Sequence, residues 1–212
     1  SITLLDDERK NMHKQPEVTA ATRKKLMDSF AELYISTPIE KITISAITKS
    51  AGVHRCTFYE YFKDIYDLLE QLENILLEQI KNEFTQIAKK NISLSSKNLT
   101  ASPDFHSFVR IALSFLMEYG DIFCYLSGSS GDPAFRENLF LIFKPIFIEM
   151  HNIPKDSPYA DYLAYSVFSL ILNNLEYWFK HKASITMEEI IALTYKLTDP
   201  SQLHACIEKI EL

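Results

Sequence analysis

The 212-residue sequence predicts an all-α fold in two parts, a small N-terminal three-helix domain and a larger C-terminal helical domain. Apolar residues recur at intervals of three and four along much of the chain, which is the spacing of one helix face. Only 4 glycines occur, and tight hairpin turns and phosphate-binding loops depend on glycine. Hydrophobic residues make up 47% of the chain, which is enough for a real core. Sheet-rich and nucleotide-binding folds are therefore disfavoured.

The first ninety residues contain four predicted helices. Residues 1–16 form a charged arm that we expect to be flexible, and the first helix runs from Thr22 to a point before Pro38. One short helix follows Thr43 and ends at Ser50, and another covers residues 54–61. Asp64 then opens a long helix. Its predicted buried face consists of Ile65, Leu68, Leu69, Leu72, Leu76, Ile80, Phe84 and Ile87.

A polar, serine-rich segment at 91–103 separates these helices from a C-terminal set. We predict further helices at 105–119, 122–126, 133–150, 158–182 and 187–197, and a loop at 127–132. The predicted organisation is therefore an arm at 1–16, a first domain at 17–66 and a second domain at 67–212.

Charge is distributed unevenly between these parts. The whole chain has a net charge of −6, but residues 9–66 hold ten Lys or Arg residues against six acidic ones. That segment is +4, so the remainder is −10. A basic module joined to an acidic body is typical of a DNA-binding protein with a separate sensing domain, although a chance fluctuation would look the same.

The cysteines and the N-terminus indicate a cytoplasmic location. Cys56, Cys124 and Cys206 lie far apart, with no C-x-x-C pair and no histidine at metal-ligand spacing. The first fourteen residues lack the apolar core of a signal peptide. We therefore expect no disulfide framework, no metal and no cofactor.

Residues 43–62 have the pattern of a helix-turn-helix, in which two short helices are joined by a three-residue turn. Here the turn is Ala51-Gly52-Val53, and Gly52 can adopt the positive φ that ends the first helix. Ile47, Val53, Phe58 and Phe62 are expected to face inward. The other side of the second helix is then left with Arg55, Cys56, Thr57, Tyr59 and Glu60.

The segment from Thr43 to Leu69, TISAITKSAGVHRCTFYEYFKDIYDLL, resembles the signature of the TetR family of transcriptional regulators. In that signature a threonine-opened helix leads through A-G-V to a T-[FL]-Y-x-[HY]-F-K core. The resemblance implies that the helix at 54–61 enters the major groove of double-stranded DNA. The implied DNA-binding residues are Thr43, Ser45, His54, Arg55, Cys56, Thr57, Tyr59, Glu60, Tyr61 and Lys63.

Their implied roles differ. Arg55 is the best candidate to read a base, since a guanidinium can bridge the O6 and N7 atoms of guanine. Cys56, Thr57 and Glu60 are placed to contact base edges, and Ser45 could also reach a base. The resemblance gives phosphate contacts to Thr43, Ser45, Tyr59, Tyr61 and Lys63.

Other interpretations of these residues stay open. Tyr59 and Tyr61 could be packing residues, Arg55 a solvated surface arginine and Cys56 a redox-sensitive thiol. Two positions depart from the family pattern. His54 replaces a common capping serine, and Ile65 replaces a frequent lysine, so fewer phosphate contacts are expected.

The helix at 158–182 is apolar on nearly every side, which predicts burial on every side. Asp161, Asn173, Asn174 and Glu176 interrupt it, so it is not expected to span a membrane. A second subunit would cover its outer face, and the family resemblance implies a homodimer built from the last two long helices. The candidate interface residues are Leu172, Leu175, Phe179 and Ile191.

The resemblance also implies an effector pocket among the C-terminal helices, where aromatic residues are dense. The candidate lining residues, for which ordinary core packing is the alternative, are Phe115, Tyr119, Phe123, Phe143, Phe147, Tyr165 and Phe168.

The expected function is that of a repressor released from a palindromic operator by a small apolar or aromatic effector. A TetR-like co-regulator acting through a protein partner is the alternative. A helical enzyme is not expected, because G-x-S-x-G, H-E-x-x-H and G-x-G-x-x-G are all missing from the sequence.

Overall fold

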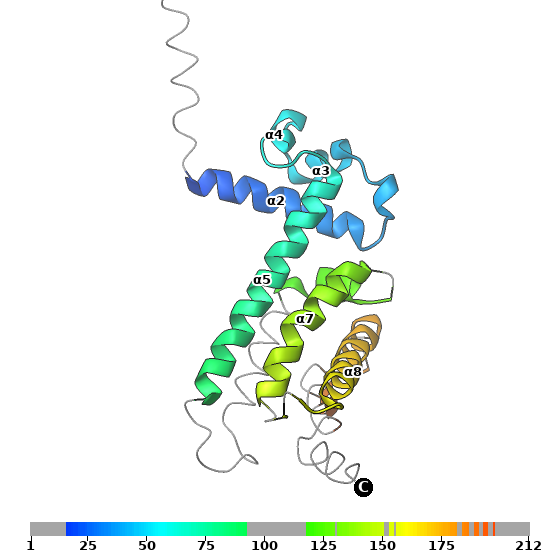
Figure 1. Cartoon of the computed structure of the whole chain (residues 1–212). Helices are drawn as coiled ribbons and strands as arrows, with labels where there is room; N and C mark the ends of the chain where they lie inside the picture. Colours follow the sequence, from blue (N-terminus) through cyan, green and yellow to red (C-terminus); the bar gives the residue numbers. More distant parts are fainter. Residues whose placement is uncertain are drawn as a thin grey trace, which may run out of the picture. The chain divides into compact units, whose positions relative to one another are not determined.

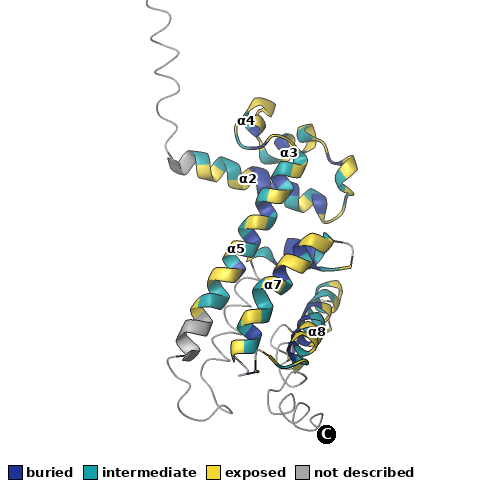
Figure 2. Cartoon of the chain, viewed as in Figure 1, coloured by how far each residue is buried: buried dark blue, intermediate teal, exposed yellow. Residues whose placement is uncertain are grey.

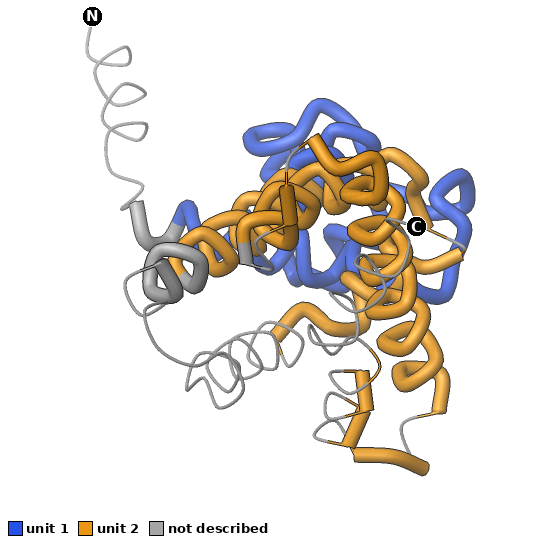
Figure 3. The backbone as a smooth tube through the Cα atoms, turned by 60° about the horizontal axis from the view of Figure 1, so that its bottom comes forward, with its two compact units in different colours: residues 1–72 blue, residues 73–212 orange. Residues whose placement is uncertain are grey.

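A computed structural model describes residues 16–92, 118–129, 131–150, 153–154, 156–181, 184–186, 189–190, 193–194 and 197. Every regular element among these residues is a helix, which confirms the all-α prediction (Figure 1). The chain divides into two compact units, Ser1–Leu72 and Glu73–Leu212 (Figure 3). The division falls inside a helix, whereas the sequence places the domain boundary after residue 66. The predicted arm lies outside the described residues, except for Pro16.

Helix α2, Pro16–Tyr34, is the first element of unit 1. It begins earlier than the predicted Thr22, and proline suits a first helical position because that residue needs no backbone N–H partner. Leu26 and Phe30 are fully buried, and the Phe30 and Tyr34 rings stack at 5.2 Å. A 3₁₀ turn, Ile39–Lys41, follows Pro38 and was not predicted.

Helices α3, Ile44–Ala51, and α4, Arg55–Tyr59, form the helix-turn-helix. Gly52 has φ 67° and ψ 34°, the left-handed conformation expected at this turn. The next amide, that of Val53, donates to the carbonyl of Thr48 at 3.0 Å and closes the end of α3. α2 packs against α3, and α3 contacts α4.

Helix α5, Ile65–Ile92, begins in unit 1 and continues into unit 2. The amide of Asp67 donates to Asp64 at 2.9 Å, and the Asp67 carboxylate accepts from the amide of Lys63 at 2.7 Å. This reciprocal arrangement satisfies amides at the start of the helix. Figure 2 shows the buried side of α5 in dark blue. It contains Leu68, Leu72, Leu76 and Ile80, as predicted.

Unit 2 contains a helix at 118–127, α7 at Pro133–Met150 and α8 at Ala160–Lys180. The break predicted between residues 119 and 122 is wrong, because the helix is continuous through Gly120. A Cβ atom at Gly120 would overlap the ring of Phe179, so glycine here permits close packing and does not end a helix. Residues 91–92 of the polar segment predicted at 91–103 belong to α5, and its remainder lies outside the described residues, as do residues 105–117 of the helix predicted at 105–119.

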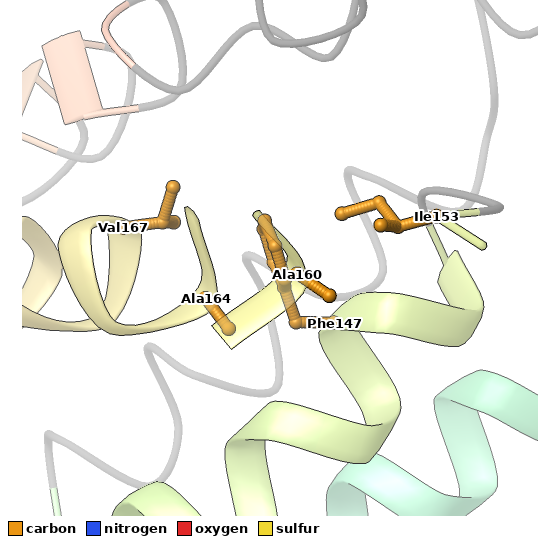
Figure 4. Packing of buried hydrophobic residues seen from close by; sticks show 5 residues of the cluster. All are labelled: Phe147, Ile153, Ala160, Ala164 and Val167. Atoms are coloured by element: carbon orange, nitrogen blue, oxygen red, sulfur yellow. The ribbon is translucent and has the colours of Figure 1, made fainter. Parts of the chain in front are cut away.

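The core between α7 and α8 is built around Phe147, Ile153, Ala160, Ala164 and Val167 (Figure 4). Alanines at 160 and 164 present little side chain, which suits close approach of α8 to its neighbour. At the surface, Lys144 pairs with Asp161 at 2.7 Å. Within the described part of the chain, no helix is long and apolar enough to cross a membrane.

The turn of the helix-turn-helix generates a stability prediction. Nothing lies within 4 Å of a Cβ atom built at Gly52, so a side chain there meets backbone strain and no clash. Gly52→Ala should lower the free energy of unfolding by about 1 to 2 kcal/mol, whereas Gly52→Asn should cost less because asparagine tolerates this conformation. Denaturant unfolding measures both. Ser50→Ala, at an exposed helical site, is the control, and equal stability of the Gly52→Ala and Ser50→Ala variants would contradict the assignment.

Candidate nucleic-acid interface

The inward side of α4 is anchored by aromatic packing. Phe58 is fully buried, Phe62 is nearly so, and their rings lie 5.3 Å apart. Ile47 of α3 is also fully buried in this unit. A five-residue helix is not stable by itself in water, so α4 depends on this packing for its conformation. The predicted inward positions Ile47, Phe58 and Phe62 are thereby confirmed.

The outward side of α4 gathers most of the predicted DNA-binding residues into one exposed surface. Tyr59 leaves 51% of its surface exposed, and Thr57 is half-buried. His54 occupies the position before α4 and makes no side-chain capping bond, as expected when serine is replaced there. The exposed members of this surface are His54, Arg55, Cys56, Tyr59 and Glu60.

Arg55 lies along this surface with its guanidinium directed at Tyr59 one turn later. Its Nη2 atom donates to the Tyr59 hydroxyl at 3.3 Å, and the guanidinium carbon is 6.0 Å from the ring centroid. A guanidinium carries five N–H donors, so one long hydrogen bond leaves donors for a further acceptor. Tyr59 therefore orients Arg55 and does not consume its binding capacity.

A second group of predicted residues lies at the start of α3. Thr43 caps this helix, and its hydroxyl oxygen accepts from the amide of Ala46 at 3.1 Å. Its hydroxyl proton can then be donated outward. Thr43 and Ser45 are both exposed, next to the positive end of the α3 dipole. Such a helix start suits a phosphate oxygen.

Tyr61 and Lys63 occupy the segment between α4 and α5. Lys63 is exposed, whereas Tyr61 is half-buried with its ring 6.2 Å from that of Phe62. The hydrogen bond from the Lys63 amide, followed by one from Gln71, lowers the pKa of the Asp67 carboxyl below its usual value. Asp67 thus stays ionised and fixes the backbone of Lys63.

Arg23, one of the ten basic residues of segment 9–66, makes its contacts within unit 1. Its Nη2 donates to the side-chain oxygen of Gln71 at 2.6 Å, and its guanidinium lies 6.0 Å from the Phe62 ring centroid. This arginine is directed into its own unit. The cluster of Arg23, Asp67 and Gln71 was not predicted from the sequence. The spacing Asp64-x-x-Asp67, an acidic form of the capping box, was the available signal for part of it.

The candidate pocket residues of unit 2 fall into separate groups. The Phe143 ring lies 5.4 Å from the rings of both Phe147 and Phe168. The Phe140 ring lies 5.3 Å from that of Phe168 and 5.4 Å from that of Tyr165. Phe123 packs against Phe135 at 6.2 Å. The Tyr119 hydroxyl accepts a hydrogen bond from the side-chain Nε2 of Gln79 at 3.2 Å. Phe115 lies outside the described residues.

The candidate interface residues on α8 already make contacts within the chain. Leu172 is 5% exposed, Leu175 and Phe179 are half-buried, and Phe179 packs on Gly120. Ile191 lies outside the described residues. One side of α8 is exposed in the single chain. On this exposed stripe, small polar residues lie between the tyrosines. This stripe consists of Tyr162, Ser166, Asn173 and Tyr177.

No group of three or more His, Cys, Asp or Glu side chains that could hold a metal ion occurs within the described ranges. Of the cysteines, Cys56 is exposed on α4 and Cys124 is buried, and Cys206 lies outside those ranges.

Comparison with known proteins confirms the resemblance found in the sequence. Residues 26–72 match the family model described as bacterial regulatory proteins, tetR family. The chain is also 24% identical, over 173 residues, to the uncharacterized HTH-type transcriptional regulator YxbF of Bacillus subtilis (strain 168). That match covers 78% of this chain but only 42% of the relative. The N-terminal part of this chain therefore carries a TetR-type DNA-binding domain.

Solved structures share the fold at low sequence identity. A TetR-family transcriptional regulator from Streptomyces coelicolor has a TM-score of 0.61 at 16% identity, covering 87% of this chain and 84% of that one. The transcriptional regulator FadR from Bacillus subtilis, in complex with stearoyl-CoA, has a TM-score of 0.59 at 17% identity, covering 83% of this chain and 95% of that one. SmeT, the repressor of a multidrug efflux pump of Stenotrophomonas maltophilia, has a TM-score of 0.59 at 13% identity, covering 85% and 89%.

The cap of α3 gives a prediction that uses near-isosteric substitutions. Thr43→Val removes the oxygen that accepts from the Ala46 amide and should lower the free energy of unfolding by about 1 kcal/mol. Thr43→Ser keeps the acceptor and should stay near the wild-type value. Thermal unfolding followed by circular dichroism distinguishes the two variants, and equal losses would mean that the hydroxyl does not act as the cap.

Proposed function

We propose that this chain, which carries a TetR-type DNA-binding domain at residues 26–72, is a cytoplasmic, homodimeric transcriptional regulator that binds a palindromic operator. The observation that carries the proposal is the two-sidedness of α4. Phe58 and Phe62 fix its inner side, and its outer side presents polar groups to solvent. A rigidly held helix with an exposed polar face suits insertion into the major groove.

In this proposal the interface residues divide into two classes. Arg55 reads guanine through its O6 and N7 atoms, and Cys56, Thr57 and Glu60 contact neighbouring base edges. Tyr59, the last residue of α4, and residues on either side of this helix bind phosphate and set the register of the helix on the duplex. These are Thr43, Ser45, His54, Tyr59, Tyr61 and Lys63.

A palindromic site requires two copies of the chain, and we assign the contact between them to the exposed side of α8 and the segment after it. Tyr162 and Tyr177 of α8 are 72% and 55% exposed, and Leu193 and Leu197 are 48% and 65% exposed. Large apolar side chains at this level of exposure favour association. This assignment replaces Leu172 with residues that have surface available.

The effector that we propose is a small apolar or aromatic molecule bound in unit 2, which relieves repression. This proposal is supported by the cluster of aromatic side chains from α7 and α8, which is centred on Phe143 and Phe168. The FadR complex indicates that this fold can accommodate stearoyl-CoA, so acyl compounds are the first class to test. Because α5 begins beside α4 and continues into unit 2, we propose that the effector acts through α5 on the recognition helices.

Reading and positioning can be separated with two variants of the DNA-binding surface. On an operator selected from a random duplex library, Arg55→Ala should lose roughly 1 to 3 kcal/mol of binding free energy and its preference at one base pair. Lys63→Ala should weaken cognate and random DNA alike and reduce the salt slope by about one unit per half-site. Binding isotherms at several salt concentrations measure both effects.

Arg55→Lys is the matched control because it keeps the positive charge and loses the planar guanidinium with its paired N–H donors. It should bind random DNA like the wild type and still lose base preference. If Arg55→Ala loses equal affinity for cognate and random duplexes, Arg55 is only a phosphate contact. If neither variant changes operator binding, DNA is read by another surface. A wild type that selects no operator favours the alternative, a co-regulator that acts through a protein partner.

The dimer contact generates a separate prediction. Tyr177→Arg places a charge in the exposed stripe of α8 without disturbing the core, so it should shift a wild-type dimer toward monomer. Asn138→Arg, at an exposed site on α7, adds the same charge elsewhere and should leave the dimer intact. Analytical ultracentrifugation at micromolar concentration measures the distribution. A monomeric wild type, or equal dissociation of both variants, would refute this contact.

A further inference from the structure

The side-chain amide of Gln71 joins three elements of unit 1. Its oxygen accepts from Nη2 of Arg23 on α2 at 2.6 Å. Its nitrogen donates to the backbone carbonyl of Tyr61 at 3.3 Å and to the carboxylate of Asp67 at 3.1 Å. The amide is half-buried, and both of its polar atoms are engaged. A residue of α5 therefore connects α2 to the segment that follows the recognition helix.

This connection holds the backbone on both sides of Phe62. The carbonyl of Tyr61 is bound by Gln71, and the amide of Lys63 is bound by Asp67 at 2.7 Å. Gln71 and Asp67 are themselves hydrogen-bonded, so the two contacts reinforce one another. The amides of Tyr61 and Phe62 donate to the carbonyl of Phe58 at 3.0 Å, and side chains of α5 bind the Tyr61 carbonyl and the Lys63 amide in the same segment.

Arg23 adds a charged contact to the same group. Its guanidinium lies over the Phe62 ring at 6.0 Å while it donates to Gln71. Hydrogen bonds with an ionised partner are roughly twice as strong as neutral ones. Arg23 therefore restrains both the amide of Gln71 and the aromatic ring that anchors the end of α4.

We propose that Gln71 is a positioning residue for DNA binding, and that Arg23, Gln71 and Asp67 form a polar latch that fixes the end of the recognition helix. The latch sets where Tyr61 and Lys63 meet the phosphates and, through Phe62, how α4 is oriented in the groove. This inference rests on the proposed function. Gln71 has no charge, so its contribution cannot be a general attraction to DNA.

The test is Gln71→Met in the full chain, which keeps side-chain length and removes all three hydrogen bonds. Its affinity for the selected operator should fall roughly tenfold, the effect of about 1.4 kcal/mol. Affinity for random duplex should fall less than affinity for the operator, because a non-specific complex does not depend on the orientation of α4, and the salt slope should stay at the wild-type value, since no phosphate-binding charge is lost. Gln86→Met is the matched control, because Gln86 is exposed on the same helix.

Two further measurements distinguish positioning from general stability. Hydrogen exchange at the Lys63 amide should speed up in Gln71→Met, while exchange of buried α2 amides such as that of Phe30 stays unchanged. Arg23→Met combined with Gln71→Met should lose less operator affinity than the sum of the single losses, because both variants break one latch. If Gln71→Met does not fold, Gln71→Glu, which still accepts from Arg23 but cannot donate to Tyr61, takes its place.

The outcomes separate this inference from the proposed function. A wild type that selects no operator contradicts the proposed function, and the exchange rate of the Lys63 amide still tests the latch. A wild type that selects an operator, together with a Gln71→Met variant that discriminates equally well, overturns the latch alone. Equal losses on cognate and random duplexes, or strictly additive losses in the double variant, also overturn it.

Discussion

The burial of Phe58 and Phe62 is the constraint on which the DNA-binding surface depends. α4 has only five residues, so its own hydrogen bonds do not suffice to keep it helical, and the burial of these two rings supports its conformation and orientation. Because both rings face inward, Arg55, Cys56, Tyr59 and Glu60 are left exposed on the other side. The same packing therefore stabilises unit 1 and determines which residues can reach DNA.

The ends of the short helices show how this packing is supported. Thr43 satisfies an amide at the start of α3, Gly52 turns the chain at its end, and Asp67 satisfies the amide of Lys63 ahead of α5. Each device is local, and together they leave little freedom to the segment between Thr43 and Lys63. A recognition helix that is held before DNA arrives loses less conformational entropy on binding.

Local signals account for what could be predicted from the sequence. Apolar spacing along α2, α5, α7 and α8, the glycine of the turn and the threonine cap are all properties of short stretches, and they predicted the helices and the outward face of α4. Other features depend on partners that are distant in the sequence. The direction of Arg23 depends on Gln71, and the continuous helix at Gly120 depends on packing against Phe179. The exposed stripe of α8 depends on the α7–α8 core. Periodicity carries no information about those partners.

The central claim is that the outer face of α4 contacts DNA, and Cys56 provides a direct probe of it. Cys56 is exposed on that face, whereas Cys124 is buried and serves as an internal reference. The measurement is the rate of Cys56 alkylation by iodoacetamide, followed by peptide mass spectrometry, with and without a saturating operator duplex. The account predicts strong protection of Cys56 by the bound duplex. An unchanged rate of alkylation with the duplex fully bound would show that DNA contacts another surface.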